Sequence, residues 1–417
     1  MNSSKKKIAY IFWTLLAVAI GLGIAAGVTR TAQYAYAKLG SPGKELFASA
    51  DRAPIHIGLP KIGKGTKFLT DSVTYKRAET QDAAVAKSPA SNNVNFGQQA
   101  DEDTIRIGWV GDITPVDTSK MPGTFAPFSE VSSLLVLPDI TAGNLEGVIT
   151  QSDTSKCSEG EANCFAFRGD LNFVELLKNS GFDVMNMANN HAFDFGKESF
   201  SDTANALLAK QITPTGAPSQ VSIVETKGVK VAFVGFAPNA GTNPMLDIEN
   251  VKRTIADAKT KADIVVAFIH AGAEGMQYLH VTDSEEVYLG ENRGNTMQIA
   301  HAMVDAGADL VLGSGPHVLR GMEKYKAKVI VYSMGNFFAS TNLSTRGLLS
   351  LSGIFMIDLA KDGTPKAATL VPLYLDTNGI PHIDGVETSI SLVNKLSTED
   401  FGGNGIMFDD AGVTQIN

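Results

Sequence analysis

Residues 181–196 read GFDVMNMANNHAFDFG, and this stretch decides the fold class. Its first half, Asp183–Met187, is a short apolar run typical of a buried strand. Its second half is polar, with Asn190 and His191 directly after the strand and Asp194 three residues further on. A buried strand that ends in a polar loop is typical of an α/β domain, in which ligands bind at the carboxyl ends of the strands.

The same change from apolar strand to polar residues occurs at four further places. Carboxylate, carboxamide or imidazole side chains follow these strands, namely Asp112, Asn144 with Glu146, His270, and His317. Each alone has an ordinary explanation, because a Gly-Asp pair usually forms a turn or a helix cap. Their recurrence at successive strand ends predicts one shared polar site.

The residue types in this predicted site favour a divalent metal. Carboxylates, carboxamides and imidazoles together form a mixed oxygen and nitrogen ligand set that suits Mn, Fe, Zn or Mg. Such an ion polarises a phosphoryl or carbonyl oxygen. The sequence contains neither a G-x-S-x-G nucleophile motif nor a complete G-x-x-x-x-G-K-[ST] phosphate loop, so a metal mechanism is favoured over a nucleophilic serine.

The remaining periodicity also predicts alternating strands and helices, with no internal repeat. Further strands are expected at 105–110, 139–143, 229–236, 263–269, 309–312, 328–332, 352–357 and 367–375. Helices are expected at 171–179, 200–210, 248–261, 297–306 and 388–396.

Composition excludes several classes of function. The 417 residues include 35 Lys and Arg against 44 Asp and Glu, a formal net charge of −9. This acidic balance argues against a nucleic-acid partner, which would need clustered basic residues. Two cysteines are too few for a cysteine-rich zinc module or a dense disulfide scaffold.

The N-terminal sequence predicts an export signal. Lys5, Lys6 and Lys7 precede the uncharged apolar run 8–28, which as a helix would cover roughly 30 Å, the thickness of a bilayer core. We interpret residues 1–7 as a cytoplasmic tail and the run as a single-pass transmembrane anchor. The alternatives are a signal peptide cleaved after the Ala35-Tyr36-Ala37 sequence, or a buried core helix.

Two later features fit an extracytoplasmic location. Residues 29–104 are rich in small and polar residues and are interpreted as a flexible spacer before a domain at 105–417. Cys157 and Cys164 flank a polar loop and could form a disulfide worth about 2–3 kcal/mol in an oxidising compartment, although two free thiols are the alternative.

An ordered set of motifs gives the sequence a family resemblance over residues 105–375. The set comprises GDITP, GNLEGVIT, GFDVMNMANNHAFDFG, VVAFIHAGAEG, DAGADLVLGSGPHVLRGME and VIVYSMGNFFAS. It resembles the CapA family of bacterial capsule biosynthesis proteins, which belongs to the metallophosphoesterase-like superfamily. The resemblance implies a four-layer αββα sandwich of two mixed sheets, in a membrane-anchored component of poly-γ-glutamate capsule synthesis.

The resemblance also implies a role for each motif residue. The implied metal ligands are Asp112, Asn144, Glu146, Asn190, His270 and His317, holding one or two ions. His191 would stabilise charge on the reacting phosphoryl group or its leaving group, with Asp194 fixing its tautomer. Arg320 and Glu274 are candidates to bind an anionic polymer or phosphoester substrate.

This sequence departs from the family pattern at three places. Gly315 stands where a further histidine is usual, and Ala271 replaces the tryptophan of a His-Trp-Gly motif. The stretch 276–296 is longer and more polar than is usual in the family. His280, within it, is either a substitute ligand or a solvated loop residue.

Two functions therefore remain open. The chain is either a metal-dependent hydrolase of the cell envelope, or a non-catalytic assembly and anchoring subunit of a polymer synthesis and export complex. A plain extracellular binding module is a third alternative.

Overall fold

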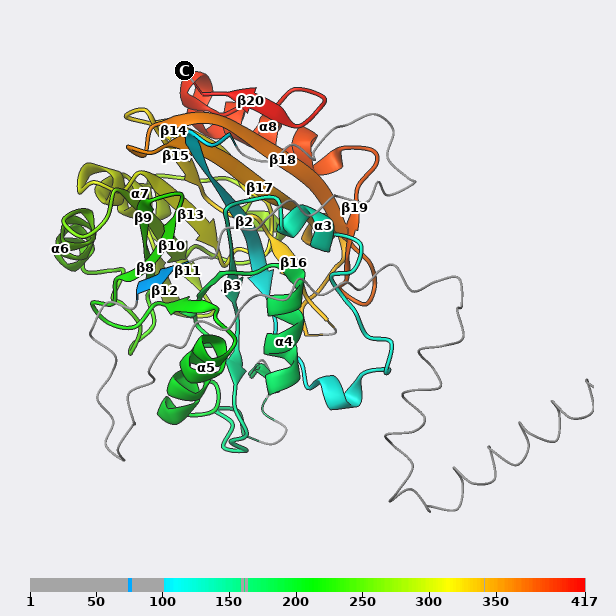
Figure 1. Ribbon diagram of the computed structural model, residues 1–417. Helices are drawn as coiled ribbons and strands as arrows, with labels where there is room; N and C mark the ends of the chain where they lie inside the picture. Colours follow the sequence, from blue (N-terminus) through cyan, green and yellow to red (C-terminus); the bar gives the residue numbers. More distant parts are fainter. Residues whose placement is uncertain (1–73, 77–100, 159–160, 162–163, 341, 417) are drawn as a thin grey trace, which may run out of the picture. The chain divides into compact units, whose positions relative to one another are not determined.

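The computed structural model describes residues 74–76, 101–158, 161, 164–340 and 342–416 (Figure 1). The predicted tail 1–7, the predicted anchor 8–28 and nearly all of the predicted spacer 29–104 lie outside these ranges. Among the described residues, no helix combines the length and apolar content needed to cross a membrane.

One mixed sheet has nine strands, in the order β19-β18-β17-β2-β3-β6-β7, with β16 joined to β2 and β20 to β18. The strands are β2 (Thr104–Ile113), β3 (Ile140–Leu145), β6 (Val184–Asn186), β7 (Thr213–Thr215), β16 (Asn336–Phe338), β17 (Leu351–Ala360), β18 (Pro365–Leu375), β19 (Pro381–Ile383) and β20 (Val413–Gln415). Strands β2, β3, β6, β7 and β16 are mutually parallel, whereas β17 pairs antiparallel with β2 and β18.

A second mixed sheet has seven strands, in the order β1-β8-β9-β10-β13-β15-β14. The strands are β1 (Thr74–Lys76), β8 (Ser222–Thr226), β9 (Val229–Phe236), β10 (Ile264–His270), β13 (Leu310–Ser314), β14 (Met322–Tyr325) and β15 (Lys328–Val331). Strands β9, β10, β13 and β15 are parallel, and β8 and β14 pair antiparallel at either end of this group. Strand β1 falls within the predicted spacer and instead pairs with β8.

Short elements complete the described fold. The helices are α3 (Ser132–Leu135), α4 (Leu171–Ser180), α5 (Lys197–Ala209), α6 (Ile248–Lys259), α7 (Thr296–Asp305) and α8 (Thr388–Phe401). Single 3₁₀ turns are η1 (Thr118–Lys120), η2 (Met276–Tyr278), η3 (Gly347–Ser350) and η4 (Gly402–Asn404). Two-stranded ribbons pair β4 (Val148–Ile149) with β5 (Arg168–Gly169), and β11 (Glu286–Tyr288) with β12 (Glu291–Gly294).

The two large sheets pack face to face, and helices cover their outer faces (Figure 1). In the central core, Trp109 of β2 stacks on Phe268 of β10, with ring centroids 4.7 Å apart. Leu177 of α4 packs in a second core on the outer face of the nine-stranded sheet. Val251 of α6 and Ile299 of α7 pack in a third core outside the seven-stranded sheet. The structure confirms the predicted α/β class, and it has the two mixed sheets that the resemblance implies.

Helix caps explain where several helices begin and end. Asp170 accepts a hydrogen bond from the Phe173 N–H at the start of α4, and Gly181 ends this helix with a φ of 107°. Asn295 caps α7 in the same way through the Gln298 N–H. A side-chain oxygen at the N-cap and a glycine just after the last turn are favoured because they satisfy backbone groups that the helix leaves unpaired.

The carboxyl ends of the central strands of both sheets meet at one edge. The Trp109 indole N–H donates to the Gly313 carbonyl oxygen at 3.2 Å, which ties β2 to β13 close to this edge. Polar residues that follow β2, β3, β6, β10 and β13 are therefore brought together from both sheets.

Candidate metal centre

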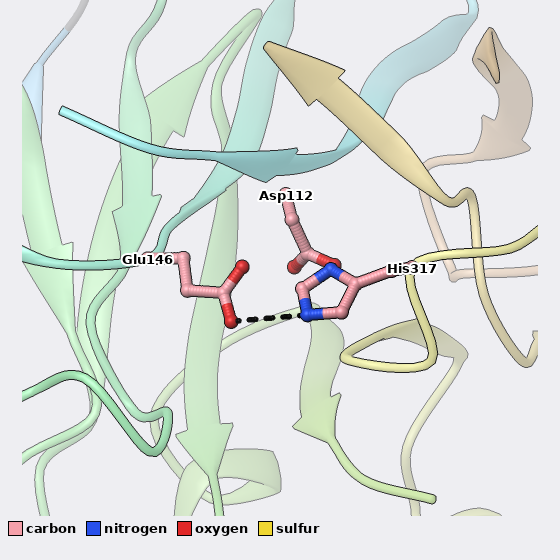
Figure 2. A group of neighbouring side chains, drawn as sticks. All are labelled: Asp112, Glu146 and His317. Atoms are coloured by element: carbon pink, nitrogen blue, oxygen red, sulfur yellow. Dashed lines mark ion pairs between the residues drawn. The ribbon is translucent and has the colours of Figure 1, made fainter. Parts of the chain in front are cut away.

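Asp112, Glu146 and His317 form the centre of the site (Figure 2). Asp112 is near the end of β2, Glu146 follows β3 directly, and His317 lies in the loop after β13. One donor atom from each lies within 4.8 Å of the other two, and all three side chains are buried. The predicted convergence of these distant residues is therefore present in the structure.

Asp112 is held in place by neighbours on both sides. The Asn144 amide donates to Asp112 Oδ1 at 2.7 Å, because the β2–β3 register sets these residues opposite each other. The Gly315 N–H donates to Asp112 Oδ2 at 3.1 Å. Burial opposes ionisation, but His317, His270 and the Asn144 hydrogen bond together lower the pKa of Asp112, so it carries a negative charge.

A glycine before Asp112 is required by close backbone packing. The Asp112 N–H donates to the Gly335 carbonyl oxygen at 2.9 Å. A Cβ at Gly111 would lie 1.8 Å from that same oxygen. Only glycine permits this approach, which explains the Gly-Asp pair at the end of β2.

Glu146 is buried with no hydrogen-bond partner at either carboxylate oxygen. Its Oε1 faces three imidazole nitrogens, with His317 Nε2 at 3.6 Å, His270 Nε2 at 3.7 Å and His191 Nε2 at 3.9 Å. Burial raises the pKa of Glu146 well above its usual range; the charge on His317 opposes this rise, and the charge on Asp112 adds to it. An unsatisfied buried carboxyl is costly unless a cation or donor compensates it.

His270, the last residue of β10, is a neutral imidazole with a free nitrogen. Burial dominates its environment and lowers the pKa of His270 to about 3. Its Nδ1 lies 3.1 Å from Asn144 Nδ2 and 3.2 Å from Ser314 Oγ, while its buried Nε2 has no hydrogen-bond partner. Neutral imidazole with one nitrogen fixed and the other free is the form in which histidine binds metals.

His317 differs from His270 because carboxylates surround it. Burial alone would lower the pKa of His317, but Glu146, Asp112 and Glu274 outweigh burial and raise it to about 10. Its Nδ1 lies 2.8 Å from Asn336 Oδ1, and its Nε2 faces Glu146. The cluster thus takes up a proton on His317 when no cation is bound.

The predicted asparagine ligands behave differently from each other. Asn144 uses both ends of its amide, since its Nδ2 donates to Asp112 and its Oδ1 accepts from Asn186 at 2.8 Å. It therefore orients Asp112, and its role as a ligand stays a prediction. Asn190 has a buried Oδ1 without a hydrogen-bond partner, so this oxygen is available as a ligand.

Asp194 holds His191 in the predicted manner, with 2.7 Å between its Oδ2 and His191 Nδ1. Burial lowers the pKa of His191, although Asp194 opposes the shift. The Phe167 ring stacks on the imidazole with centroids 4.2 Å apart, and the Phe167 N–H donates to Asp194 Oδ2 at 2.6 Å. Lys156 Nζ binds the other carboxylate oxygen, Oδ1, at 2.6 Å.

Lys156 and Phe167 lie on either side of the disulfide between Cys157 and Cys164. The structure therefore confirms that these two cysteines pair. Lys156 and Phe167, which flank the disulfide, supply contacts that fix His191 and Asp194.

Arg320 does not occupy the substrate-facing position predicted for it. Its guanidinium is fully buried and makes two hydrogen bonds to Glu286, at 2.9 and 2.7 Å, and a third to the Tyr278 carbonyl oxygen. A buried arginine with these partners holds the β11–β12 hairpin in place instead of binding an anion. His280 is also outside the site, since it is half exposed and pairs with Asp400 at 2.7 Å.

Several site residues were not predicted from the sequence. Asn336 contacts His317, and its only signal was its place in the MGNFF segment quoted for the resemblance. Asn189 accepts the His191 N–H at 3.0 Å and lies within the quoted Asn-Asn-His triplet. Arg293, which contacts the predicted substrate residue Glu274 at 3.1 Å, lies in the polar stretch 276–296 and had no signal.

The donor set fits a divalent cation. Two ligands of one ion, each about 2.1 Å from it, are separated by roughly 3.0–3.4 Å. The distances of 3.6–3.9 Å from Glu146 Oε1 to the three imidazole nitrogens are slightly larger. A cation would satisfy the unpaired oxygens of Glu146 and the free Nε2 of His270, and its binding would release the proton from His317.

The comparisons with known proteins place this site in a family. The family model described as "Bacterial capsule synthesis protein PGA_cap" matches residues 106–341, and the chain belongs to this family. That range includes all the candidate site residues described above.

Two curated relatives carry capsule-related names. The "PGA biosynthesis protein CapA" of Bacillus subtilis (strain 168) is 30% identical over 287 residues, which span 64% of this chain and 70% of the relative. The "Capsule biosynthesis protein CapA" of Bacillus anthracis is 29% identical over 235 residues, spanning 52% of this chain and 54% of the relative.

Among solved structures, a putative 5′-nucleotidase from Staphylococcus aureus matches with 17% identity and a TM-score of 0.37, over 70% of this chain and 58% of that chain. The chain thus spans little more than half the length of the second relative and of this nucleotidase.

Proposed function

We propose that the chain is an extracytoplasmic, divalent-metal-binding protein of capsule or surface-polymer synthesis, with hydrolase-type chemistry of the metallophosphoesterase kind. Poly-γ-glutamate is the polymer that the family resemblance suggests. The observation that carries the proposal is the buried Glu146 carboxyl, which has no hydrogen-bond partner and faces three imidazoles. Such a group is costly unless a cation binds beside it.

The residues that would hold the ion are Asp112, Glu146, His270 and His317, with Asn190 Oδ1 available. When bound, a divalent ion supplies Lewis-acid polarisation of a phosphoryl or carbonyl oxygen. Asp112 contributes a negative charge to the site, while Asn144 and the Gly315 N–H fix the direction in which its carboxylate points.

His191 is the group placed to move a proton. Its Nδ1 is held by the Asp194 carboxylate, so the neutral ring presents the lone pair of Nε2 towards Glu146 and the cluster. Nε2 can accept a proton from an attacking water and return it to a leaving oxygen. The Phe167 ring stacked on the imidazole shields one face of the ring from water.

Membrane anchoring through residues 8–28 and exposure of the domain outside the cytoplasm belong to the same proposal. The apolar run supports the anchor, and the Cys157–Cys164 disulfide supports an oxidising compartment. A chain lacking residues 8–28 should leave the membrane fraction. If the truncated chain sediments with membranes as the full chain does, the anchor is misassigned.

The complete burial of Asp112, Glu146 and His270 favours a second candidate function. A closed metal site suits a structural ion in an assembly subunit of the synthesis and export complex, whose partners would be other subunits of that complex. Elemental analysis of the purified full-length chain, a phosphodiesterase assay with added Mn²⁺ and polymer production in cells together distinguish the two.

Asp112→Asn serves as the decisive variant because it removes the buried charge while nearly preserving the shape of the side chain. An enzyme should lose metal, turnover and polymer production together. An assembly subunit should show no turnover in either form, and polymer production should follow the amount of folded chain. A wild-type chain that binds no Mn²⁺, Fe²⁺, Zn²⁺ or Mg²⁺ would refute the metal proposal itself.

A further inference from the structure

Glu274 approaches the metal centre from the loop that follows β10. Its Oε2 lies 3.6 Å from His317 Nε2, the same separation that His317 Nε2 has from Glu146 Oε1. His317 Nε2 is therefore flanked by two carboxylates at equal distances. Because the side chain of Glu274 is 18% exposed, it is the more accessible of these two carboxylates.

Arg293 fixes the direction of the Glu274 carboxylate. Its Nη2 lies 3.1 Å from Glu274 Oε1, which leaves Oε2 facing His317. Arg293 is itself buried and held by Glu291, whose Oε2 accepts from the Arg293 Nε–H at 3.0 Å. Its guanidinium thus engages one oxygen of Glu274 and leaves the other facing His317.

The backbone around Glu274 is tied to the rest of the site. The Gly272 N–H donates to the Arg293 carbonyl oxygen at 3.1 Å, and the Gly275 N–H donates to the Pro316 carbonyl oxygen at 3.0 Å. Between them, the Ala273 N–H donates to Glu286 Oε2 at 2.9 Å. The loop is therefore anchored both to the hairpin that carries Arg293 and to the loop that carries His317.

We propose that Glu274 is a protein ligand of the divalent cation and that Arg293 is its positioning residue. This inference rests on the proposed metal centre. From the sequence alone, Glu274 was a candidate to contact substrate; its geometry relative to His317 Nε2 points to the cation instead. A second carboxylate ligand adds negative charge and an oxygen donor, which favours a hard divalent ion such as Mn²⁺ or Mg²⁺.

Isothermal titration calorimetry of the chelator-treated full-length chain with Mn²⁺ tests the proposal. Glu274→Gln should weaken Mn²⁺ binding by at least roughly tenfold. Glu285→Gln is the matched control, because Glu285 is an exposed glutamate of the same polar stretch and has no role in the proposed site. It should leave Mn²⁺ affinity within about twofold of the wild-type value, since exposed charges contribute little.

A double variant separates ligation from simple charge balance. If Glu274 only neutralises Arg293, then Arg293→Gln in the Glu274→Gln background should restore Mn²⁺ affinity. If Glu274 is a ligand, the double variant should bind as weakly as Glu274→Gln. Visible absorption of Co²⁺ in the same site gives a second readout, because losing a ligand changes its coordination geometry and its spectrum.

Failure of this ligand assignment can be distinguished from failure of the proposed metal centre. If the wild-type chain binds Mn²⁺ and Glu274→Gln binds it equally well, the ligand assignment is wrong and the proposed centre stands. If the double variant regains wild-type affinity, the assignment is also wrong. If the wild-type chain binds no cation, the proposed function fails first.

Discussion

Two buried histidines of the candidate metal centre have pKa values shifted in opposite directions. His270 lies 3.7 Å from both Asp112 Oδ1 and Glu146 Oε1, but burial outweighs the charge of Asp112 and lowers the pKa of His270 to about 3. His317 has carboxylates at both ring nitrogens, and their charges overcome burial and raise its pKa to about 10. At neutral pH the metal-free site therefore holds one charged and one neutral imidazole.

These two pKa shifts predict how the stability of the metal-free protein depends on pH. Below about 6.5, the unfolded chain protonates His270 and the folded chain does not, so stability falls as the pH drops from about 6.5 towards 3. Above about 6.5, only the folded chain keeps the proton on His317, so stability falls as the pH rises towards 10. Urea unfolding at a series of pH values in chelator should show a maximum near pH 6.5.

Single substitutions show which histidine causes the loss of stability on each side of the pH maximum. His270→Asn should flatten the acidic side and leave the alkaline side unchanged. His317→Asn should flatten the alkaline side and also change the acidic side, because His317 helps to lower the pKa of Asp112. An alkaline side unaffected by His317→Asn would show that other groups set it.

The sequence predicted the site residues that directly follow a recognisable strand. It did not predict the residues that act by positioning another side chain of the site. Asp112, Glu146, His270 and His317 each stand at or just after the end of an apolar run, so the convergence of parallel strand ends predicted their meeting. Arg293 lies in a polar stretch without periodicity. Arg320 lies three residues past His317 in the sequence. Its hydrogen bond to Glu286, 34 residues earlier, directs its side chain away from the site.

At the scale of elements, the β11–β12 hairpin and the segment containing the disulfide had the weakest sequence signals. The long central strands and helices α4 to α8 were predicted because their apolar periodicity extends over many residues. The three-residue strands β7 and β16 are too short to show a period, and pairing with β6 and β2 defines them. Strand β6 was predicted from its short apolar run. Both short ribbons nevertheless position residues of the site.

Because Arg320 and Glu286 form a buried ion pair, we expect a substitution of Arg320 to reduce the stability of the fold. The sequence instead predicted that it would weaken substrate binding. Arg320→Met removes the partner of a buried carboxylate and should destabilise the fold by about 3–5 kcal/mol. Chemical denaturation measures this loss. The double variant Arg320→Met with Glu286→Leu should recover much of it, because no unpaired charge remains buried. A stable Arg320→Met protein with weakened substrate binding would support the original assignment.

The disulfide predicts a coupled effect on stability and on His191. Cys157→Ser with Cys164→Ser should reduce the free energy of unfolding by about 2–3 kcal/mol through lost chain constraint. It should also loosen Lys156 and Phe167, which hold Asp194 and stack on His191. Urea unfolding with and without reductant measures the first effect. The sequence has only these two cysteines, so reductant should not alter the double variant.

At the scale of the whole described domain, the arrangement of layers could be predicted and its packing contacts between sheets could not. Alternating strands and helices indicated an α/β fold, and the resemblance supplied two mixed sheets. Which side chains cross between the sheets depends on packing: Trp109 of one sheet stacks on Phe268 of the other and reaches Gly313 through its indole N–H. The candidate metal centre also joins the two sheets, since Asp112 and Glu146 come from one sheet and His270 and His317 from the other. The meeting of these four residues was predicted, because each stands at or just after a strand end.

Metal removal should therefore loosen the contact between the two sheets. At a free Mn²⁺ concentration 100 times the dissociation constant, the bound ion should stabilise the fold by about 2.7 kcal/mol, and chelator should remove this gain. Trp109 lies in the inter-sheet core, three positions before Asp112, so its fluorescence reports the change directly. The Trp13→Phe variant isolates this signal, because the chain has two tryptophans. Asp112→Asn is the control and should show the same unfolding midpoint with Mn²⁺ as with chelator; a wild-type midpoint that chelator leaves unchanged would mean that no ion joins the sheets.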